Sequence, residues 1–262
     1  MKKIIAIVLA TVMMLTLMLS MTSCDVKELL SFLDKGEDDN KLVMATNAYF
    51  QPYEYYEGDE IVGIDAEIAA AIAEYLDMEL EIVNMEFDSI ITAVNAGDVD
   101  FGMAGMTVTE ERLLEVDFSS SYATGVQAII VKENSPIKSV DDLYAEGADY
   151  KVGVQAGTTG DIYSTDDFGA DNVERHTNGN NAVMALNKDA VDCVIIDNEP
   201  AKALVKANTG LKILETAYAN EDYAICVKKG NTELLDKINE AIEALTADGT
   251  IDRIVAKYIP AE

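Results

Sequence analysis

The chain has 262 residues, of which 48 are Asp or Glu and 19 are Lys or Arg, so its formal net charge at pH 7 is −29. A surface this acidic repels phosphate backbones, which excludes nucleic acid as an expected partner. Hydrophobic residues make up 49% of the chain, enough for a packed core and outside the range typical of disordered sequences.

The N-terminus has the pattern of an export signal. A short basic head precedes an apolar run over residues 4–20, and small residues then lead up to Cys24. The alternative is an uncleaved membrane anchor, but the run is shorter than the roughly 20 apolar residues that a membrane span prefers. We therefore predict a signal peptide over residues 1–23 and a polar tether over residues 24–40.

The stretch "MTSC" that ends at Cys24 resembles the lipobox of bacterial lipoproteins, with Met21 where those proteins usually have leucine. The resemblance implies that Cys24 is lipidated and becomes the new N-terminus. A protein processed in this way would be anchored on the outer face of the cytoplasmic membrane.

From Lys41 onward, short β-rich runs alternate with runs of helical spacing. We predict strands over 41–46, 79–83, 99–105, 150–154 and 191–196. We predict helices over 65–76, 88–97, 180–189, 199–208, 232–249 and 251–259. Strands that alternate with helices predict an α/β fold, with each sheet flanked by helices.

Two helix–strand units in this pattern are similar to each other. Residues 93–105 and 185–197 align at a constant offset of 92, with four identical positions. Chance could supply four identities among such common residues, so the residues that follow each unit matter more. The first unit leads to Thr107 and Arg112, and the second ends at Asp197. Because ligands of open α/β sheets bind beyond the carboxyl ends of strands, the two units would present a cation and an anion to one cleft.

Arg112 lies at a predicted helix start, which is an unfavourable place for a cation without a nearby anion. Thr107 and Glu110 have the spacing of a capping box, and Thr109 is an alternative cap. A ligand carboxylate bound by the Arg112 guanidinium would supply the anion. The alternative is a surface ion pair with one of the neighbouring glutamates.

The sequence shows few signs of a catalytic, metal-binding or nucleotide-binding site. His176 is the sole histidine, which is too few for a catalytic triad or a histidine-based metal site. The glycines of "GVQAGTTG" (153–160) do not have the spacing of the dinucleotide fingerprint. Cys193 and Cys226 lie in apolar runs typical of buried, unpaired thiols. We expect no cofactor, no metal and no enzymatic activity, although 48 acidic residues leave room for a carboxylate-pair enzyme.

Four stretches of the chain, 42–76, 85–112, 116–125 and 152–160, resemble successive blocks of the family 3 solute-binding proteins, the polar amino acid receptors of bacterial ABC importers. The resemblance implies a two-lobed periplasmic-binding-protein-like fold of type II, in which two hinge strands join the lobes and the lobes close over an α-amino acid. It places lobe 1 at residues 41–122 plus 223–262 and lobe 2 at residues 123–222.

The resemblance also implies a set of ligand-binding residues. Arg112 would bind the ligand α-carboxylate, and Asp197 would bind the α-ammonium group. Beside them would lie backbone and hydroxyl donors, aromatic walls and polar side chains: Ala104, Gly105, Thr107, Gln155, Thr159, Phe50, Phe87 and Asn47. Several of these also have a purely structural interpretation, because Phe50 and Phe87 could be core residues and Thr159 and Asp197 could be helix caps.

These inferences together predict a monomeric, lipid-anchored receptor that delivers a free amino acid to an ABC transporter permease. Asn47 can both donate and accept, which favours an uncharged polar ligand side chain, whereas the acidic surface favours Arg or Lys. Because salt screens distant charges, we rank polar uncharged amino acids narrowly first. The alternatives are a dehydratase-like enzyme of the same fold and a ligand-sensing protein.

Overall fold

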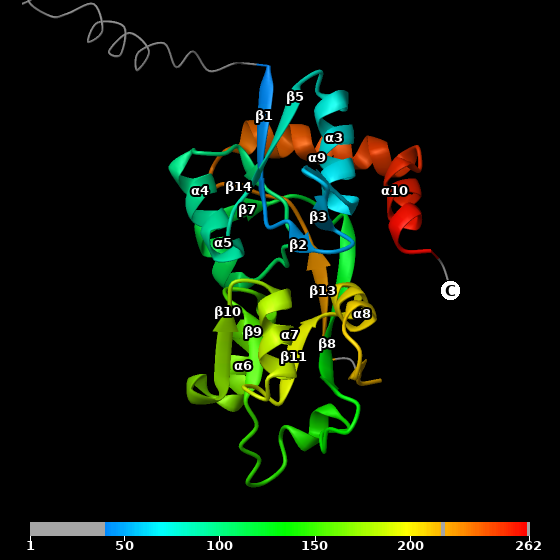
Figure 1. Ribbon diagram of the computed structural model, residues 1–262. Helices are drawn as coiled ribbons and strands as arrows, with labels where there is room; N and C mark the ends of the chain where they lie inside the picture. The colour runs from blue at the N-terminus through cyan, green and yellow to red at the C-terminus, as the bar shows by residue number, and fades with distance from the viewer. Residues whose placement is uncertain (1–39, 216–217, 261–262) are drawn as a thin grey trace, which may run out of the picture. The chain divides into compact units, whose positions relative to one another are not determined.

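The computed structural model describes residues 40–215 and 218–260 (Figure 1). The predicted signal peptide, the predicted lipidation site Cys24 and the predicted tether up to residue 39 lie outside these residues. Leu42–Glu262 pack as one unit, which holds two larger sheets and one smaller sheet. None of the helices in the described part of the chain is long and apolar enough to cross a bilayer.

The larger sheet of lobe 1 has the strand order β5-β1-β6-β14-β7. The strands are β1 (Lys41–Thr46), β5 (Glu79–Asn84), β6 (Phe101–Gly102), β7 (Val116–Phe118) and β14 (Cys226–Lys228). β1 runs parallel to β6, whereas β14 lies between β6 and β7 and is antiparallel to both. A short hairpin sheet precedes the first helix and comprises β2 (Tyr49–Phe50), β3 (Glu54–Glu57) and β4 (Glu60–Val62).

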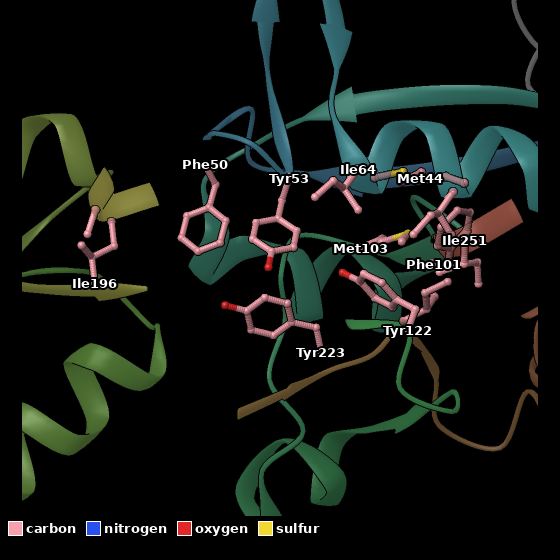
Figure 2. Packing of buried hydrophobic residues seen from close by; sticks show 14 of the residues in the cluster. Met44, Phe50, Tyr53, Ile64, Phe101, Met103, Tyr122, Ile196, Tyr223 and Ile251 are labelled. Carbon is pink, nitrogen blue, oxygen red and sulfur yellow. The ribbon is translucent and has the colours of Figure 1, made fainter. Parts of the chain in front are cut away.

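Helices cover the sheet of lobe 1 with regularly spaced apolar residues. The helices are α3 (Ile64–Tyr75), α4 (Ile90–Ala96), α5 (Glu110–Glu115), α9 (Thr232–Ala247) and α10 (Thr250–Tyr258). α3 packs on β5, α9 and α10, and α4 packs on β6 and β14. Ile64, Ile68 and Ile72 lie on one face of α3 and are fully buried, as the four-residue spacing requires. Figure 2 shows Ile64 with Met44, Phe101 and other members of this core.

The sheet of lobe 2 has the strand order β10-β9-β11-β8-β12, and β13 also pairs with β8. The strands are β8 (Ala123–Lys132), β9 (Val152–Gln155), β10 (Val173–His176), β11 (Cys193–Asp197), β12 (Leu211–Ile213) and β13 (Ala219–Tyr223). The helices are α6 (Thr159–Phe168), α7 (Gly179–Asn187) and α8 (Asn198–Ala207). α6 and α7 pack on β9, β10 and β11, and α8 packs on β8, β11 and β12. Short 3₁₀ helices lie at Phe87–Ser89, Val140–Asp142 and Ala170–Asn172.

The chain passes between the two larger sheets along two neighbouring strands. β8 and β13 are antiparallel, and their pairing runs from Ala219 opposite Gln127 to Tyr223 opposite Ala123. These are the hinge strands of the two-lobed fold. The strands of the five-stranded sheet come before β8 or after β13, and the strands between β8 and β13 belong to the sheet of lobe 2. The lobe boundaries at residues 122/123 and 222/223 remain a prediction.

The two similar helix–strand units occupy equivalent places in the two lobes. α4 leads into β6, which is parallel to β1, and α7 leads into β11, which is parallel to β9. The strand predicted over 99–105 is shorter in the structure, because the chain leaves the sheet after Gly102 and turns at Gly105, whose φ is 53°. The predicted helix over 88–97 begins instead as a 3₁₀ turn and ends at Gly97 in the left-handed conformation.

The two cysteines of the described residues lie in different sheets. Cys193 is in β11 and Cys226 is in β14, and both thiols are free and fully buried. Burial raises the pKa of each thiol to about 12. Both side chains are therefore protonated at neutral pH and act as small apolar core groups.

Candidate ligand-binding site

A single pocket brings together all ten side chains or backbone positions that the sequence predicts as ligand-binding. Its lining consists of Asn47, Phe50, Phe87, Ala104, Gly105, Thr107, Arg112, Gln155, Thr159 and Asp197, together with Glu54 and Thr158. The first seven residues and Glu54 come from lobe 1, and the other four come from lobe 2. Their roles in binding remain predictions, and the lining of the pocket comes from both lobes.

Arg112 lies inside the pocket rather than on the surface. It sits in the first turn of α5, where Thr109 is the N-cap and accepts a hydrogen bond from the Arg112 amide. The guanidinium donates from Nη1 to the Thr107 carbonyl (2.6 Å) and from Nη2 to the Gly157 carbonyl of lobe 2 (3.0 Å). It also lies over the Phe87 ring, 5.3 Å from the centroid. Arg112 is only 6% exposed, so the alternative of a surface ion pair is wrong.

The Arg112 guanidinium remains charged despite its burial. Burial lowers its pKa, and nearby Glu221 opposes that shift, but an arginine pKa stays far above neutral in proteins. Among residues 40–215 and 218–260, no carboxylate forms an ion pair with Arg112. The pocket therefore contains a buried cation with capacity for an anion.

Asp197 places a carboxylate in the same pocket at the carboxyl end of β11. Gln127 donates to Oδ2 (2.7 Å), and the Tyr223 hydroxyl donates to Oδ1. Gln127 also donates to Glu221 (3.0 Å), so two carboxyl groups share one amide. Burial, followed by the charge of Glu221, raises the pKa of Asp197 to about 8. Asp197 occupies the N-cap position of α8 but its side chain makes no capping hydrogen bond, which leaves it available to the pocket.

The two lobes are in direct contact across the pocket. Gln155 of lobe 2 donates from Nε2 to Asn47 Oδ1 (3.0 Å), and Asn47 donates from Nδ2 to the Met85 carbonyl (2.7 Å). Both polar atoms of the Asn47 amide therefore already have protein partners. The bond from Arg112 to Gly157 and the bond from Tyr223 to Asp197 also join the two lobes at the pocket.

Thr158 rather than Thr159 caps α6, because its hydroxyl accepts from the Asp161 amide (3.3 Å). The Thr159 hydroxyl accepts a longer hydrogen bond from Gln127 (3.4 Å) and lines the pocket. The interpretation of Thr159 as a helix cap is therefore wrong.

Aromatic side chains close one wall of the pocket. A Cβ atom on Gly105 would lie 2.7 Å from Phe50 Cε1, so only glycine fits at this close approach. Phe50 packs on Tyr53 (5.8 Å between centroids), and Tyr53 meets the edge of Tyr223 (5.2 Å). Figure 2 shows this row of three rings, with the Tyr53 and Tyr223 hydroxyl groups at its centre. The row joins lobe 1 to the end of hinge strand β13.

Several residues of the site carry no local sequence signal. Glu54 lines the pocket and is fully buried, yet it stands in "PYEYYEGDE", which has the composition of an exposed hairpin. Gln127 and Glu221 lie on the two hinge strands and meet through tertiary packing. Burial decreases along β3 from Glu54 to Glu57 without alternating, so the strand pattern gives no clue to Glu54 either.

The arrangement suits a zwitterion. A buried guanidinium can donate two parallel hydrogen bonds to a carboxylate, and a buried carboxylate can accept hydrogen bonds from an ammonium group. A small molecule with both groups on one carbon could contact both residues at once, and its ammonium group would favour the ionised form of Asp197. In the described part of the chain, no three His, Cys, Asp or Glu side chains come together as metal ligands.

Comparisons with known proteins identify the family. Residues 42–261 match the model of the bacterial extracellular solute-binding proteins, family 3. The chain is 34% identical over 227 residues to the arginine-binding extracellular protein ArtP of Bacillus subtilis, covering 85% of this chain and 87% of that protein. These relatives are solute-binding receptors, not enzymes.

Solved structures give the same assignment. A structure of an ancestral arginine-binding protein bound to arginine has a TM-score of 0.78 and 41% identity, covering 84% of this chain and 98% of that one. An ancestral arginine-binding protein bound to glutamine has a TM-score of 0.79 and 40% identity, covering 85% of this chain and 99% of that one. The fold is thus the two-lobed type expected from the sequence, and the chain belongs to family 3 of the bacterial extracellular solute-binding proteins.

Proposed function

We propose that this protein captures a free α-amino acid between its lobes and delivers it to an ABC transporter permease. The observation that carries the proposal is the presence of one buried guanidinium, on Arg112, and one buried carboxylate, on Asp197, in a single pocket. Arg112 would hold the α-carboxylate with Thr107 and Thr159 beside it. Asp197 would hold the α-ammonium group.

We further propose that the ligand has a basic side chain, with arginine the first candidate. The ranking of polar uncharged side chains first depends on the Asn47 amide, which has one protein partner on each polar atom and keeps one N–H and one lone pair, so it does not decide between the two classes. Relatives described as arginine-binding support the basic class. A relative structure that contains glutamine makes glutamine the appropriate competitor.

We propose that the mature protein is monomeric and is held at the outer face of the cytoplasmic membrane by a lipid on Cys24. The sequence that precedes Cys24 supports this proposal. Mass spectrometry of the mature N-terminus tests it: an unmodified residue 24, or an intact residue 1, would contradict it.

A thermal-shift panel of the twenty common amino acids tests the ligand proposal. The protein is first unfolded and refolded to remove any ligand carried through purification. At 100 times the dissociation constant, a ligand stabilises the protein by about 2.7 kcal/mol, which corresponds to a rise in Tm of about 5–10 °C for a chain of this size. We expect arginine to give the largest rise. No rise with any amino acid would contradict the proposed function, and a rise with uncharged amino acids alone would contradict the basic class.

We also propose that ligand binding closes the lobes about β8 and β13. The hydrogen bonds between the lobes at the pocket, such as Arg112 to Gly157 and Gln155 to Asn47, support this, because they need the lobes in contact. Small-angle scattering of the refolded protein should give a smaller radius of gyration at saturating arginine than without ligand. An equal radius in both states, under conditions in which calorimetry shows saturation, would contradict closure.

A further inference from the structure

Gln127 lies at the centre of three paired strands that meet next to the pocket. It stands opposite Asp197 of β11 on one side and opposite Ala219 of hinge strand β13 on the other. Residues that are opposite each other, or two positions further along, share one face of a sheet. Glu221 therefore lies on the same face as Gln127 and Asp197. The Gln127 amide accordingly reaches both carboxyl groups, at 2.7 Å from Asp197 and 3.0 Å from Glu221.

Glu221 points inward because the side chains of β13 alternate between the two faces of the sheet. Asn220 and Asp222 are exposed, whereas Glu221 is 5% exposed and Tyr223 is fully buried. Among the residues that the structure describes, no cation forms an ion pair with Glu221 or Asp197. A buried carboxylate without an ion-pair partner is costly, so two of them side by side favour a bound proton.

The contact between the two carboxyl groups itself requires a proton. Asp197 and Glu221 lie within hydrogen-bonding reach of each other. Two carboxylates cannot donate to each other, so one member of the pair has to be protonated. The two shorter hydrogen bonds of the Gln127 amide go to the two carboxyl groups, and the Tyr223 hydroxyl donates to Asp197 Oδ1. The arrangement fits a pair of carboxyl groups that carries a single proton.

We propose that Asp197 and Glu221 share one proton in the ligand-free protein and that the α-ammonium group of the bound amino acid displaces it. Glu221 is then a positioning residue, which acts on the ligand through Asp197. The inference rests on the proposed function and adds a proton to the binding reaction. The pair loses its proton to solvent, the ammonium group keeps its own protons, and the ionised Asp197 pairs with that group, so charge and atoms balance.

The surroundings of the pair place the proton on Asp197 at neutral pH. Burial, followed by the charge of Glu221, raises the pKa of Asp197 to about 8, while hydrogen bonds from Tyr223 and Gln127 oppose the shift. The other titratable groups near the pair in the described part of the chain are Tyr163 of α6, Arg112 of α5, Glu199 of α8, and Tyr53 and Glu54 at the start of β3. Arg112 is the one cation in this set, and the ligand carboxylate would neutralise it.

The affinity for the amino acid should therefore rise with pH up to about 8. Below this value, binding has to remove the proton from the pair, and the free-energy cost of removing it increases as the pH falls. Above this value the pair is already ionised, so the dependence of affinity on pH levels off. The receptor would hold its ligand at neutral pH and release it more readily in acid.

Calorimetry with arginine tests the inference on the wild type and on Glu221→Gln. Titrations at pH 7 in phosphate and in Tris, which differ in ionisation enthalpy, give the number of protons released. The matched control is Asp222→Asn, which removes the same charge from the same strand at an exposed position. Because all three proteins receive the same ligand, protons exchanged elsewhere in the pocket cancel in the comparison.

We expect Glu221→Gln to release at least about half a proton fewer than the wild type and Asp222→Asn. The dissociation constant of the wild type for arginine should fall about tenfold or more between pH 6 and pH 8. In Glu221→Gln this fall should be at least about three times smaller, because an amide beside Asp197 no longer opposes its ionisation. A purely structural role of Glu221 would weaken binding at every pH and leave the proton count unchanged.

If Glu221→Gln does not fold, NMR spectroscopy of the wild type tests the inference directly. The carboxyl carbon signal of Asp197 is assigned by its absence in Asp197→Asn. At pH 6 this signal should report a protonated group without ligand and an ionised group at saturating arginine. An ionised Asp197 at pH 6 in the ligand-free protein would contradict the inference.

The outcomes separate this inference from the proposed function. A wild type that binds no amino acid would contradict the proposed function. A wild type that binds only uncharged amino acids would contradict the basic ligand class, and the same titrations with glutamine then test the inference. A wild type that binds its ligand without releasing a proton, or that releases as many protons as Glu221→Gln, would contradict the inference alone.

Discussion

Replacing Arg112 with alanine should abolish measurable amino acid binding. Under the proposed function, the change removes a bidentate, charge-assisted contact made by a residue that is only 6% exposed. Each hydrogen bond to a charged group contributes about 1.5–3 kcal/mol, so the loss of two weakens binding by about 10²- to 10⁴-fold. Titration calorimetry with arginine measures the effect. Arg112→Lys should recover little affinity, because lysine lacks the planar fork and its hydrogen bonds to the Thr107 and Gly157 carbonyls.

A matched control for this prediction is Arg253→Ala. Arg253 lies on the exposed face of α10 and bonds to residues of its own helix start. The substitution Arg253→Ala removes the same charge from the protein without changing the pocket. The dissociation constant for arginine should therefore equal that of the wild type within error. Wild-type affinity in Arg112→Ala would exclude Arg112 as the carboxylate-binding group.

Replacing Asp197 with asparagine should have opposite effects on binding and on the stability of the ligand-free protein. Binding should weaken by about 100-fold or more, because the α-ammonium group loses its counter-charge and faces amide hydrogens instead. Stability should rise at neutral pH. Folding raises the pKa of Asp197 from its ordinary value of 3.8 to about 8. The wild type therefore loses stability as the pH increases between these two values.

Thermal melts of the ligand-free protein between pH 5 and pH 8 measure the stability effect. The difference in Tm between Asp197→Asn and the wild type should grow with pH in this range. Asp171→Asn, at an exposed position outside the pocket, serves as the control for the substitution and should bind arginine as the wild type does. Unchanged affinity for arginine in Asp197→Asn would rule out Asp197 as the ammonium-binding group.

The sequence predicts most of the regular elements because their signals are local. The predicted strand over 41–46 matches β1, and the predicted helices over 65–76 and 199–208 each lie within one residue of α3 and α8 at both ends. The errors occur where tertiary packing, rather than local sequence, determines the length of an element. β6 has two residues, not seven, because Gly105 turns the chain toward the pocket. α6 was not predicted because its ten residues include few apolar positions with helical spacing.

The residues of the candidate site also fall into two groups, those that the sequence predicts and those that depend on tertiary packing. Arg112 and Asp197 are predictable because each follows a strand of a repeated helix–strand unit, and the ends of such strands meet at a cleft. The position of Glu54 in the pocket cannot be predicted in this way, because its burial depends on α3, which brings Asp65 beside it. One glutamate among 48 acidic residues gives no local sign that its side chain points inward. The capping role of Thr158 likewise depends on where the helix actually begins.

The position of β14 constrains the order in which the protein can fold. β14 fills the gap between β6 and β7, yet it is formed by residues 226–228, near the end of the chain. All strands of the lobe 2 sheet, in contrast, come from one continuous segment between residues 123 and 223. Only two residues separate the last strand of that segment, β13, from β14, so both sheets wait for nearly the same length of chain during synthesis. In an exported chain, neither sheet could then be complete before residues 219–228 are available.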